Sequence, residues 1–391
     1  MREIIVTKAE AGQRFDRFLG RYLPEVSSGF IHKMLRKKNI KLNAGRADGS
    51  EKIKEGDAIQ IFFAEETLRK FTGEDRTAGP LTEEEKKLRA QVRLLYSSDD
   101  VLIFHKPAGM LTQKAKKDDD SLNDYLLDYC RAQMGMTEEM FRRFRPSVAN
   151  RLDRNTSGIV LCGVTTAGLQ KLARLLRERG MEKYYLCIVQ GVLREDRKIR
   201  GWLYKDEKKN TVTLLTRPAK GAEPVETRYQ VLAASSRATL LKVRLITGKS
   251  HQIRAHLASE GHPVLGDYKY GSRKENDILK RMTGINYQML HSYEIRMSGG
   301  QIEDENTGIV TMAGRAGEPD GKKGLHVIDP PPEDFVRAME MYGLSPDSIR
   351  KKTETDGRHR RKTDRSEEND GNMDIQRTAG FRPRRNGKLH K

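Results

Sequence analysis

A chain of 391 residues exceeds one ordinary domain, and its lysines and arginines outnumber its aspartates and glutamates by 19. This excess indicates a polyanionic partner, either nucleic acid or an acidic membrane surface. No apolar run is long enough to span a bilayer, and the N-terminus lacks the apolar core of a signal peptide. The three cysteines form no CxxC pair, which predicts a reducing cytoplasmic location and no structural zinc.

The first predicted unit, residues 1–63, is a small module of two short helices followed by a hairpin. Apolar residues at helical spacing predict a helix over 13–23, and a serine at 27–28 can cap a second helix. Short strand-like runs follow at 40–43 and 58–62, each next to turn-forming residues. The module is therefore expected to present helices and a small sheet together.

The order of these pieces resembles the S4 RNA-binding domain. The matching residues are Gly12-x-Arg14-x-Asp16-x-x-Leu19, then Ile40-x-Leu42-Asn43, then Gly56-Asp57-x-Ile59. The resemblance implies RNA contacts from basic side chains of the two helices, namely Arg14, Lys33, Arg36 and Lys37. The alternative is that these residues form only the solvated basic face of a generic helical hairpin.

Beyond the module, composition divides the chain into three further parts. Residues 64–90 are charged and interrupted by Thr-Gly and Gly-Pro, which predicts a flexible linker. Residues 91–344 are rich in strands that follow one another closely, which favours an α+β domain with a mixed, mainly antiparallel sheet over βαβ units. Residues 345–391 are dense in charge and nearly empty of aliphatic side chains, so they are predicted to be a disordered basic tail. The tail would add phosphate contacts or serve solubility alone.

Within 91–344 the apolar pattern predicts alternating strands and helices. Strands are expected at 101–104, 147–149, 159–162, 183–189, 211–216, 226–233 and 238–246, and helices at 121–131, 137–144, 166–179 and 251–257. The run at 166–179 has one apolar face and a glycine at its end, as helices of this kind do.

One loop joins two of these predicted buried strands and carries an aspartate between two arginines. Asp153 has Arg151 and Arg154 beside it, and flanking cations favour the ionised form of a carboxylate. Rigid strands on both sides would fix its position, which a nucleophile or a general base needs. The alternative for this loop alone is an aspartate in a surface ion pair.

Three segments of this domain, in this order, closely resemble the pseudouridine synthases that act on ribosomal RNA, the large family with an Arg-Leu-Asp motif. The first is Arg151-Leu152-Asp153 with Thr156-Ser157-Gly158, and the second is Lys183-Tyr184-Tyr185-x-x-x-Val189-x-Gly191. The third is Thr247-Gly248-Lys249-Ser250-His251-Gln252-Ile253-Arg254-x-His256-Leu257, which continues through Gly261-His262-Pro263 to Gly266-Asp267-x-x-Tyr270-Gly271. Lys106-Pro107-Ala108-Gly109 and Met289-Leu290-His291 also fit, so the resemblance covers about residues 91–340. One departure is Asn150, where many members have histidine.

The resemblance implies roles for three residues. Asp153 would be the catalytic aspartate, Tyr185 the active-site tyrosine and Arg254 the basic partner of the aspartate. The family detaches uracil from C1′ of its ribose, turns it and rejoins it through C5, which needs no cofactor and no metal. The carboxylate would attack C1′ or remove a proton from C2′, and the residues do not separate these routes. A uridine in folded RNA must first be flipped into the pocket.

Other polar residues near these motifs are expected to contact RNA. Arg151 and Arg154 would position the loop or bind phosphate, and His251 would be structural or face RNA. Lys106 would contact RNA or be an ordinary charge at a strand end. His251 and His256 do not have the i, i+4 spacing of a zinc pair.

The function that follows is conversion of uridine to pseudouridine, most simply in large-subunit ribosomal RNA, by a cytoplasmic monomer. The competing hypothesis is an RNA-binding ribosome-assembly protein whose synthase domain is catalytically idle. The intact set of Asp153, Tyr185 and Arg254 favours the enzyme, because an idle domain has no chemical need for all three. A membrane-surface protein fits less well, because no basic amphipathic, aromatic-rich helix is present.

Overall fold

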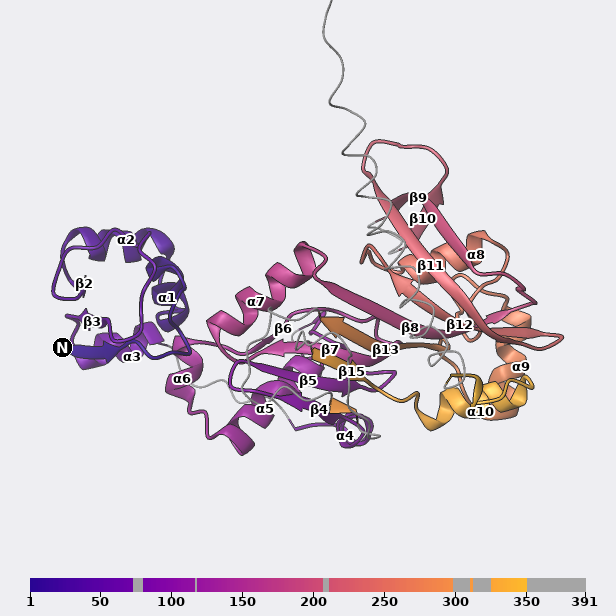
Figure 1. Cartoon of the computed structure of the whole chain (residues 1–391). Coiled ribbons are helices and arrows are strands. Elements are labelled where there is room, and N and C mark those ends of the chain that lie inside the picture. The colour runs from indigo at the N-terminus through magenta and orange to yellow at the C-terminus, as the bar shows by residue number, and fades with distance from the viewer. Residues whose placement is uncertain (73–79, 117, 207–210, 298–309, 312–324, 350–391) are drawn as a thin grey trace, which may run out of the picture.

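The computed structural model describes residues 1–72, 80–116, 118–206, 211–297, 310–311 and 325–349. Two parts are visible in Figure 1: an N-terminal module (residues 1–72) and a larger body (the described residues from 80 to 349). Among the described residues, no helix has the length and apolar character needed to cross a membrane.

The N-terminal module packs helices on a three-stranded antiparallel sheet of order β1-β3-β2. One face of α1 carries four buried side chains, Phe15, Phe18, Leu19 and Tyr22, and the Ser27 side chain caps α2 by accepting from Phe30 N. Two short helices followed by an antiparallel hairpin are thus observed as predicted. The elements are β1 (Arg2–Ile5), α1 (Phe15–Tyr22), α2 (Ser28–Arg36), β2 (Ile40–Leu42), β3 (Ala58–Ile61) and α3 (Glu65–Thr72).

One twelve-stranded sheet organises the body, with β10-β9-β11-β12-β8-β13-β7-β5-β4 as its main path. Its strands are β4 (Arg93–Ser97), β5 (Val101–Lys106), β6 (Ser147–Val148), β7 (Ser157–Gly163), β8 (Met181–Gln190), β9 (Arg197–Asp206), β10 (Thr211–Leu215), β11 (Ala222–Ala234), β12 (Ala238–Leu245), β13 (Leu290–Met297), β14 (Val310–Thr311) and β15 (Leu325–Ile328). Neighbours on the main path are antiparallel except β7 and β13, which are parallel. The α+β class with a mainly antiparallel mixed sheet is therefore confirmed.

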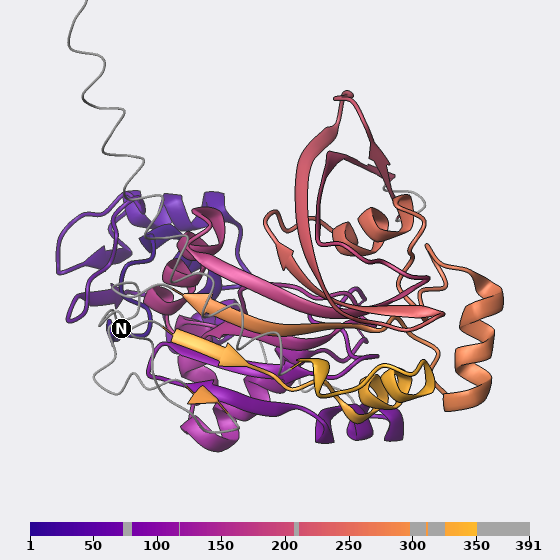
Figure 2. The same cartoon turned by 45° about the vertical axis from the view of Figure 1, so that its right-hand side comes forward.

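Helices cover both faces of the central strands. Along β5 the side chains alternate, so Leu102 and Phe104 pack with α5 while Val101 and Ile103 pack with α7. Figure 2 shows the strands around β9 and β11 rising away from the rest of the sheet, and α8 contacts β10 and β11 there. The body's helices are α4 (Glu83–Ala90), α5 (Leu122–Met134), α6 (Glu138–Arg143), α7 (Thr166–Arg177), α8 (Gln252–Ser259), α9 (Arg273–Thr283) and α10 (Glu333–Met341).

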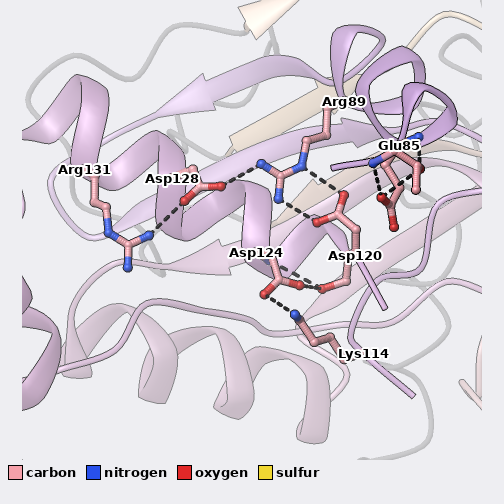
Figure 3. Close-up of polar contacts among 9 residues, drawn as sticks. Glu85, Arg89, Lys114, Asp120, Asp124, Asp128 and Arg131 are labelled. Atoms are coloured by element: carbon pink, nitrogen blue, oxygen red, sulfur yellow. Dashed lines mark hydrogen bonds and ion pairs between the residues drawn. The ribbon is translucent and has the colours of Figure 1, made fainter. Parts of the chain in front are cut away.

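The predicted flexible linker over 64–90 is wrong for most of its described residues, because two helices form there. Helix α3 buries Leu68 in the core of the N-terminal module. Helix α4 begins with a capping box in which Thr82 and Glu85 each accept the other's backbone N–H. Arg89 at its end pairs with Asp120 and Asp128 of the body, as Figure 3 shows. Residues 73–79 lie outside the described residues.

The C-terminal boundary also differs from the prediction. Residues 345–349, placed in the tail from composition, pack on the body, and Ile349 is buried in its main core. Leu344 and Ile349 belong to the same core, and composition averaged over a longer stretch does not reveal the burial of one aliphatic side chain. The remainder of the predicted tail, from residue 350, lies outside the described residues.

Candidate active site

The loop that carries Asp153 is fixed by buried contacts to its backbone. The Thr112 side chain donates to Leu152 O at 2.9 Å and accepts from Leu152 N at 3.1 Å. Lys106 Nζ donates to Arg154 O at 3.0 Å, and Gln288 donates to the Thr156 hydroxyl at 3.1 Å. These bonds hold the loop on both sides of Asp153, so its carboxylate has a defined place.

Asn150, which stands where many family members have histidine, is part of this scaffold. Its side chain accepts from Leu161 N at 2.7 Å and donates to Ile159 O at 3.4 Å. Both partners belong to β7, so the amide extends the pairing between β6 and β7 up to the Asp153 loop. A side chain that both donates and accepts suits this position.

Sheet register brings Tyr185 next to the same loop. Ser292 on β13 lies opposite Tyr185 on β8 and opposite Gly158 on β7. A Cβ at Gly158 would lie 2.3 Å from Ser292 O, and its φ is +115°, so only glycine permits this close approach. Neighbouring strands are about 4.8 Å apart, which places Tyr185 two strands from the start of β7.

Arg254 on α8 connects Asp153 to a second aspartate. Its Nη1 donates to Asp153 Oδ2 at 2.7 Å, while its Nε and Nη2 donate to the two oxygens of Asp267 at 2.7 and 2.8 Å. The Asp267 side chain is fully buried and that of Asp153 is 27% exposed. The pair with Asp267 therefore fixes the guanidinium, and the guanidinium in turn orients Asp153.

Helix α8 is itself anchored by the residue before Ile253. The Gln252 amide donates to Glu226 O at 3.0 Å and to the Thr227 hydroxyl at 2.9 Å, and its oxygen accepts from Thr247 and Lys249. Six consecutive residues of the helix, from Gln252 to Leu257, are buried. The His-Gln-Ile-Arg segment thus positions Arg254 through its neighbours.

Two aromatic residues complete the surroundings of the pair. His251 precedes α8 in a left-handed conformation, with its Nδ1 2.8 Å from the Tyr270 hydroxyl and its Nε2 4.0 Å from Asp153 Oδ1. The Tyr270 ring lies 5.2 Å from the Arg254 guanidinium carbon. Burial lowers the pKa of His251 despite the nearby carboxylate, so the imidazole is neutral at neutral pH.

One pocket of about 600 Å³ is lined by the Asp153 loop, by Lys183 and Tyr185 of β8, and by residues 245–254, which lead into α8. Asp153, Tyr185 and Arg254 all contribute to its wall, so the structure brings together the three residues predicted to be catalytic. Burial raises the pKa of Tyr185 to about 12, with a hydrogen bond to Ser292 acting in the opposite direction. Its hydroxyl is therefore protonated at neutral pH. Burial also lowers the pKa of Lys183, another lining residue.

Two of the RNA contacts predicted for the body, Lys106 and Arg154, are not at this pocket. Lys106 is fully buried, and its Nζ donates to three backbone carbonyls, those of Pro107, Met110 and Arg154. The prediction that Lys106 binds RNA is wrong, because its amine donates all of its hydrogen bonds inside the protein. Burial also lowers the pKa of Lys106 to about 7. The Arg154 side chain lines a separate, smaller cavity, whereas Arg151 is exposed at the wall of the main pocket.

The other predicted RNA-binding residues lie on the N-terminal module. Lys33, Arg36 and Lys37 are exposed on or next to α2. Arg14 is also exposed and pairs with Asp16 at 2.7 Å. His256, unlike these residues, is buried with its Nδ1 2.7 Å from the Thr227 hydroxyl, which agrees with a structural role.

From the sequence, no role in the site was predicted for Asp267, Tyr270 or Lys183, although all three lie within the motifs that carry the resemblance. Asp267 stands within a quoted motif, and its role follows once Arg254 is known to be buried, because a buried guanidinium requires a carboxylate partner. Tyr270 and Lys183 also lie within the motifs that carry the resemblance, but their residue types alone indicate no role, since tyrosines and lysines are common in folded cores and on surfaces.

Comparison with known proteins gives a consistent result. Residues 100–259 match the family model described as RNA pseudouridylate synthase. The chain is 31% identical over 302 residues to the ribosomal large subunit pseudouridine synthase C of Escherichia coli, covering 75% of this chain and 88% of that one. It is 30% identical over 293 residues to the Vibrio vulnificus protein of the same name, covering 74% and 85% respectively. The solved structure of human RNA pseudouridylate synthase domain containing 4 shares this fold with a TM-score of 0.50 at 18% identity, over 66% of this chain and 95% of that one.

Proposed function

The chain belongs to the RNA pseudouridine synthase family, and from this membership we propose that it isomerises uridine in large-subunit ribosomal RNA with Asp153 as the catalytic residue. Relatives named for the large ribosomal subunit support this substrate. The observation that carries the assignment is the Asp153 carboxylate in the pocket, held on one oxygen by an arginine that a second, buried aspartate locks in place.

The geometry suits a carboxylate that must act while ionised. Arg254 donates to Oδ2, whereas Oδ1 receives no hydrogen bond from the described part of the protein and is left for the nucleotide. In the reaction the C1′–N1 bond breaks, the uracil turns and the C1′–C5 bond forms, while a proton leaves C5 and N1 takes one. Attack of Asp153 on C1′ and proton removal from C2′ both require the ionised form.

Tyr185 and the pocket walls would hold the base during this rotation. A phenol with its pKa raised to about 12 stays protonated and can stack on the uracil or donate a hydrogen bond to it. Extruding a uridine from folded RNA costs a few kcal/mol, so binding of phosphates elsewhere on the protein must offset this cost. The exposed basic side chains of the N-terminal module, Arg14, Lys33, Arg36 and Lys37, are the proposed source, as in an S4-type domain.

In this proposal the protein is a cytoplasmic monomer and needs no cofactor. All three cysteines are buried and free, which suits a reducing compartment. Exposed large apolar residues of the described chain lie on several elements, among them Met134 on α5, Tyr204 on β9 and Met282 on α9. Light scattering after gel filtration would give the mass in solution directly.

The decisive experiment is tritium release from ribosomal RNA labelled at C5 of uridine, with wild type and Asp153→Ala in parallel. We expect release by the wild type only, with RNA binding retained in the variant. Release by Asp153→Ala at the wild-type rate would overturn the assigned role of the residue. Tight binding without release by either protein would favour the catalytically idle RNA-binding protein.

A further inference from the structure

The N-terminal module is docked on the body through a small polar junction at α6 and α7. Thr166 N donates to Ala9 O at 2.8 Å, and the Gln170 amide donates to Gly12 O at 3.2 Å. Figure 1 shows α7 running from the module side of the body toward β8. The start of α7 therefore touches the module while its other end approaches the pocket.

A second set of bonds ties the module to the end of α6. Arg143 O accepts from the Gln13 side chain at 3.3 Å and from Arg21 Nη1 at 3.1 Å. The Arg21 guanidinium carbon also lies 5.9 Å from the centre of the Phe144 ring. The chain that leaves α6 thus starts at the module as well.

Two segments consequently lead from the junction to the pocket. One is α7 with the turn that follows it: Arg177 ends the helix, Arg179 lies in the turn, and both line the pocket. The other is the stretch 144–151, whose last residues, from Ala149 to Arg151, line it too. From Gln170 to Arg177 the helix rises about 10 Å, so the module and the pocket are joined by a short path over the surface.

Both segments carry exposed arginines that lack a carboxylate partner among the described residues. They are Arg145 and Arg151 on one segment and Arg174 and Arg179 on the other, and Arg17 continues the series on α1. Gln170, Arg174 and Arg177 have the i, i+4, i+7 spacing of one helix face, so the face that meets the module is also the face that carries these cations.

Cations are crowded at the junction itself. Burial, followed by repulsion from Arg145 and Arg17, lowers the pKa of Arg21. Many other arginines among the described residues pair with a carboxylate, as Arg89 does with Asp120 and Arg244 with Glu182. A purely solubilising surface does not need to gather like charges where two parts of the protein meet, whereas a polyanion bound there would relieve the repulsion.

We propose that the phosphate backbone flanking the flipped uridine runs from the pocket to the N-terminal module along these two segments, contacting Arg145, Arg174 and Arg17. This inference rests on the proposed function, because that function makes RNA the substrate. The module, the junction and the pocket would then form one continuous surface that binds a single RNA molecule.

The test compares two triple variants with equal loss of charge. The first is Arg17→Gln, Arg145→Gln and Arg174→Gln. The matched control is Arg273→Gln, Lys274→Gln and Arg281→Gln on α9, at the opposite end of the molecule from the module (Figure 1). Binding of a labelled ribosomal RNA fragment is measured over a range of salt concentrations, and tritium release is measured at saturating RNA.

We expect the first variant to bind at least about tenfold more weakly at 0.15 M salt, with a log–log salt slope reduced by about 2, since each phosphate contact contributes about 0.7. Its kcat should stay at the wild-type value, because the pocket is untouched, and the α9 control should bind as the wild type does. Equal slopes for the two triple variants would overturn the inference.

A third protein separates charge from structure. Arg17→Lys, Arg145→Lys and Arg174→Lys keep the charges, and lysine also binds phosphate. This variant should regain the wild-type slope, and failure to regain it would mean that the glutamines act by disturbing the junction, which also overturns the inference. Absence of tritium release by the wild type would instead refute the proposed function, and the salt slopes would still decide whether RNA follows these segments.

Discussion

Two arginines of this chain are held in the same way, yet only one belongs to the candidate active site. Arg254 donates through Nε and Nη2 to Asp267 and through Nη1 to Asp153. Arg89 donates through Nε and Nη2 to Asp120 and through Nη1 to Asp128, as Figure 3 shows. In both cases the carboxylates raise the pKa of the guanidinium.

The difference lies in what surrounds the second aspartate. Asp153 stands in a pocket with Tyr185 and keeps one oxygen unengaged by the described protein. Asp128 is 52% exposed and its other oxygen accepts from Arg131, so both of its oxygens are occupied. An arginine between two aspartates is therefore not by itself a catalytic arrangement. The pocket and the unengaged oxygen distinguish a site from a clamp that holds α4 on α5.

The largest expected difference between the two clusters is in activity. Asp153→Asn should lower the rate of pseudouridine formation by at least about 10³-fold, because an amide cannot act as the nucleophile or base. Asp128→Asn makes the same chemical change in the other cluster and should leave the rate unchanged. Tritium release under single-turnover conditions measures both. A comparable loss in the two variants would show that the clusters do not differ as described.

The two clusters should also differ in how much the free energy of unfolding falls when the bidentate aspartate, Asp267 or Asp120, is replaced. Asp267→Asn leaves the buried Arg254 without its bidentate partner and should cost about 3–5 kcal/mol in the free energy of unfolding. Asp120→Asn should cost about 1–2 kcal/mol, since the Arg89 side chain is 16% exposed and water can replace part of the lost bond. Urea unfolding followed by circular dichroism gives both values. Equal costs would contradict the difference in burial.

Acid should weaken the site region, because the helix that carries Arg254 also carries a buried histidine, His256. Burial lowers the pKa of His256 to about 4. The unfolded chain takes up the proton first, so stability is full above a pH of about 6.5 and is lost between there and about 4. Between pH 7.5 and pH 5 the wild type should lose about 1–2 kcal/mol more than His256→Asn. Urea unfolding of both proteins at the two pH values measures these losses. An equal loss in the wild type and in His256→Asn would contradict the prediction.

The smallest effect is expected at the outer edge of the clamp. Arg131 is 40% exposed and pairs with Asp128 and Glu138 on the surface. Arg131→Gln should change the free energy of unfolding by less than about 0.5 kcal/mol, because exposed ion pairs contribute little. A thermal melt beside that of Asp120→Asn would show the contrast. A loss equal to that of Asp120→Asn would mean that the network acts as one unit.

The prediction of helices was weakest where local composition masked capping and packing. Charged residues over 64–90 suggested a linker, although α3 needs only the burial of Leu68 and α4 only its capping box and the Arg89 clamp. The strand β9 and the helix α9 were not predicted, since each buries few side chains and its apolar pattern is sparse.

The sequence by itself determined the class of the fold, the order of most strands and the three residues expected to be catalytic. Apolar periodicity is a local property of the chain. Each of the three motifs that carry Asp153, Tyr185 and Arg254 is likewise a short continuous segment of the sequence. Only the tertiary structure decided that Arg254 joins Asp153 to Asp267, that Lys106 is spent on backbone carbonyls, and that Arg154 faces another cavity. The physical reason is that hydrogen-bond partners distant in sequence, and the direction of each loop side chain, are fixed by strand register and packing.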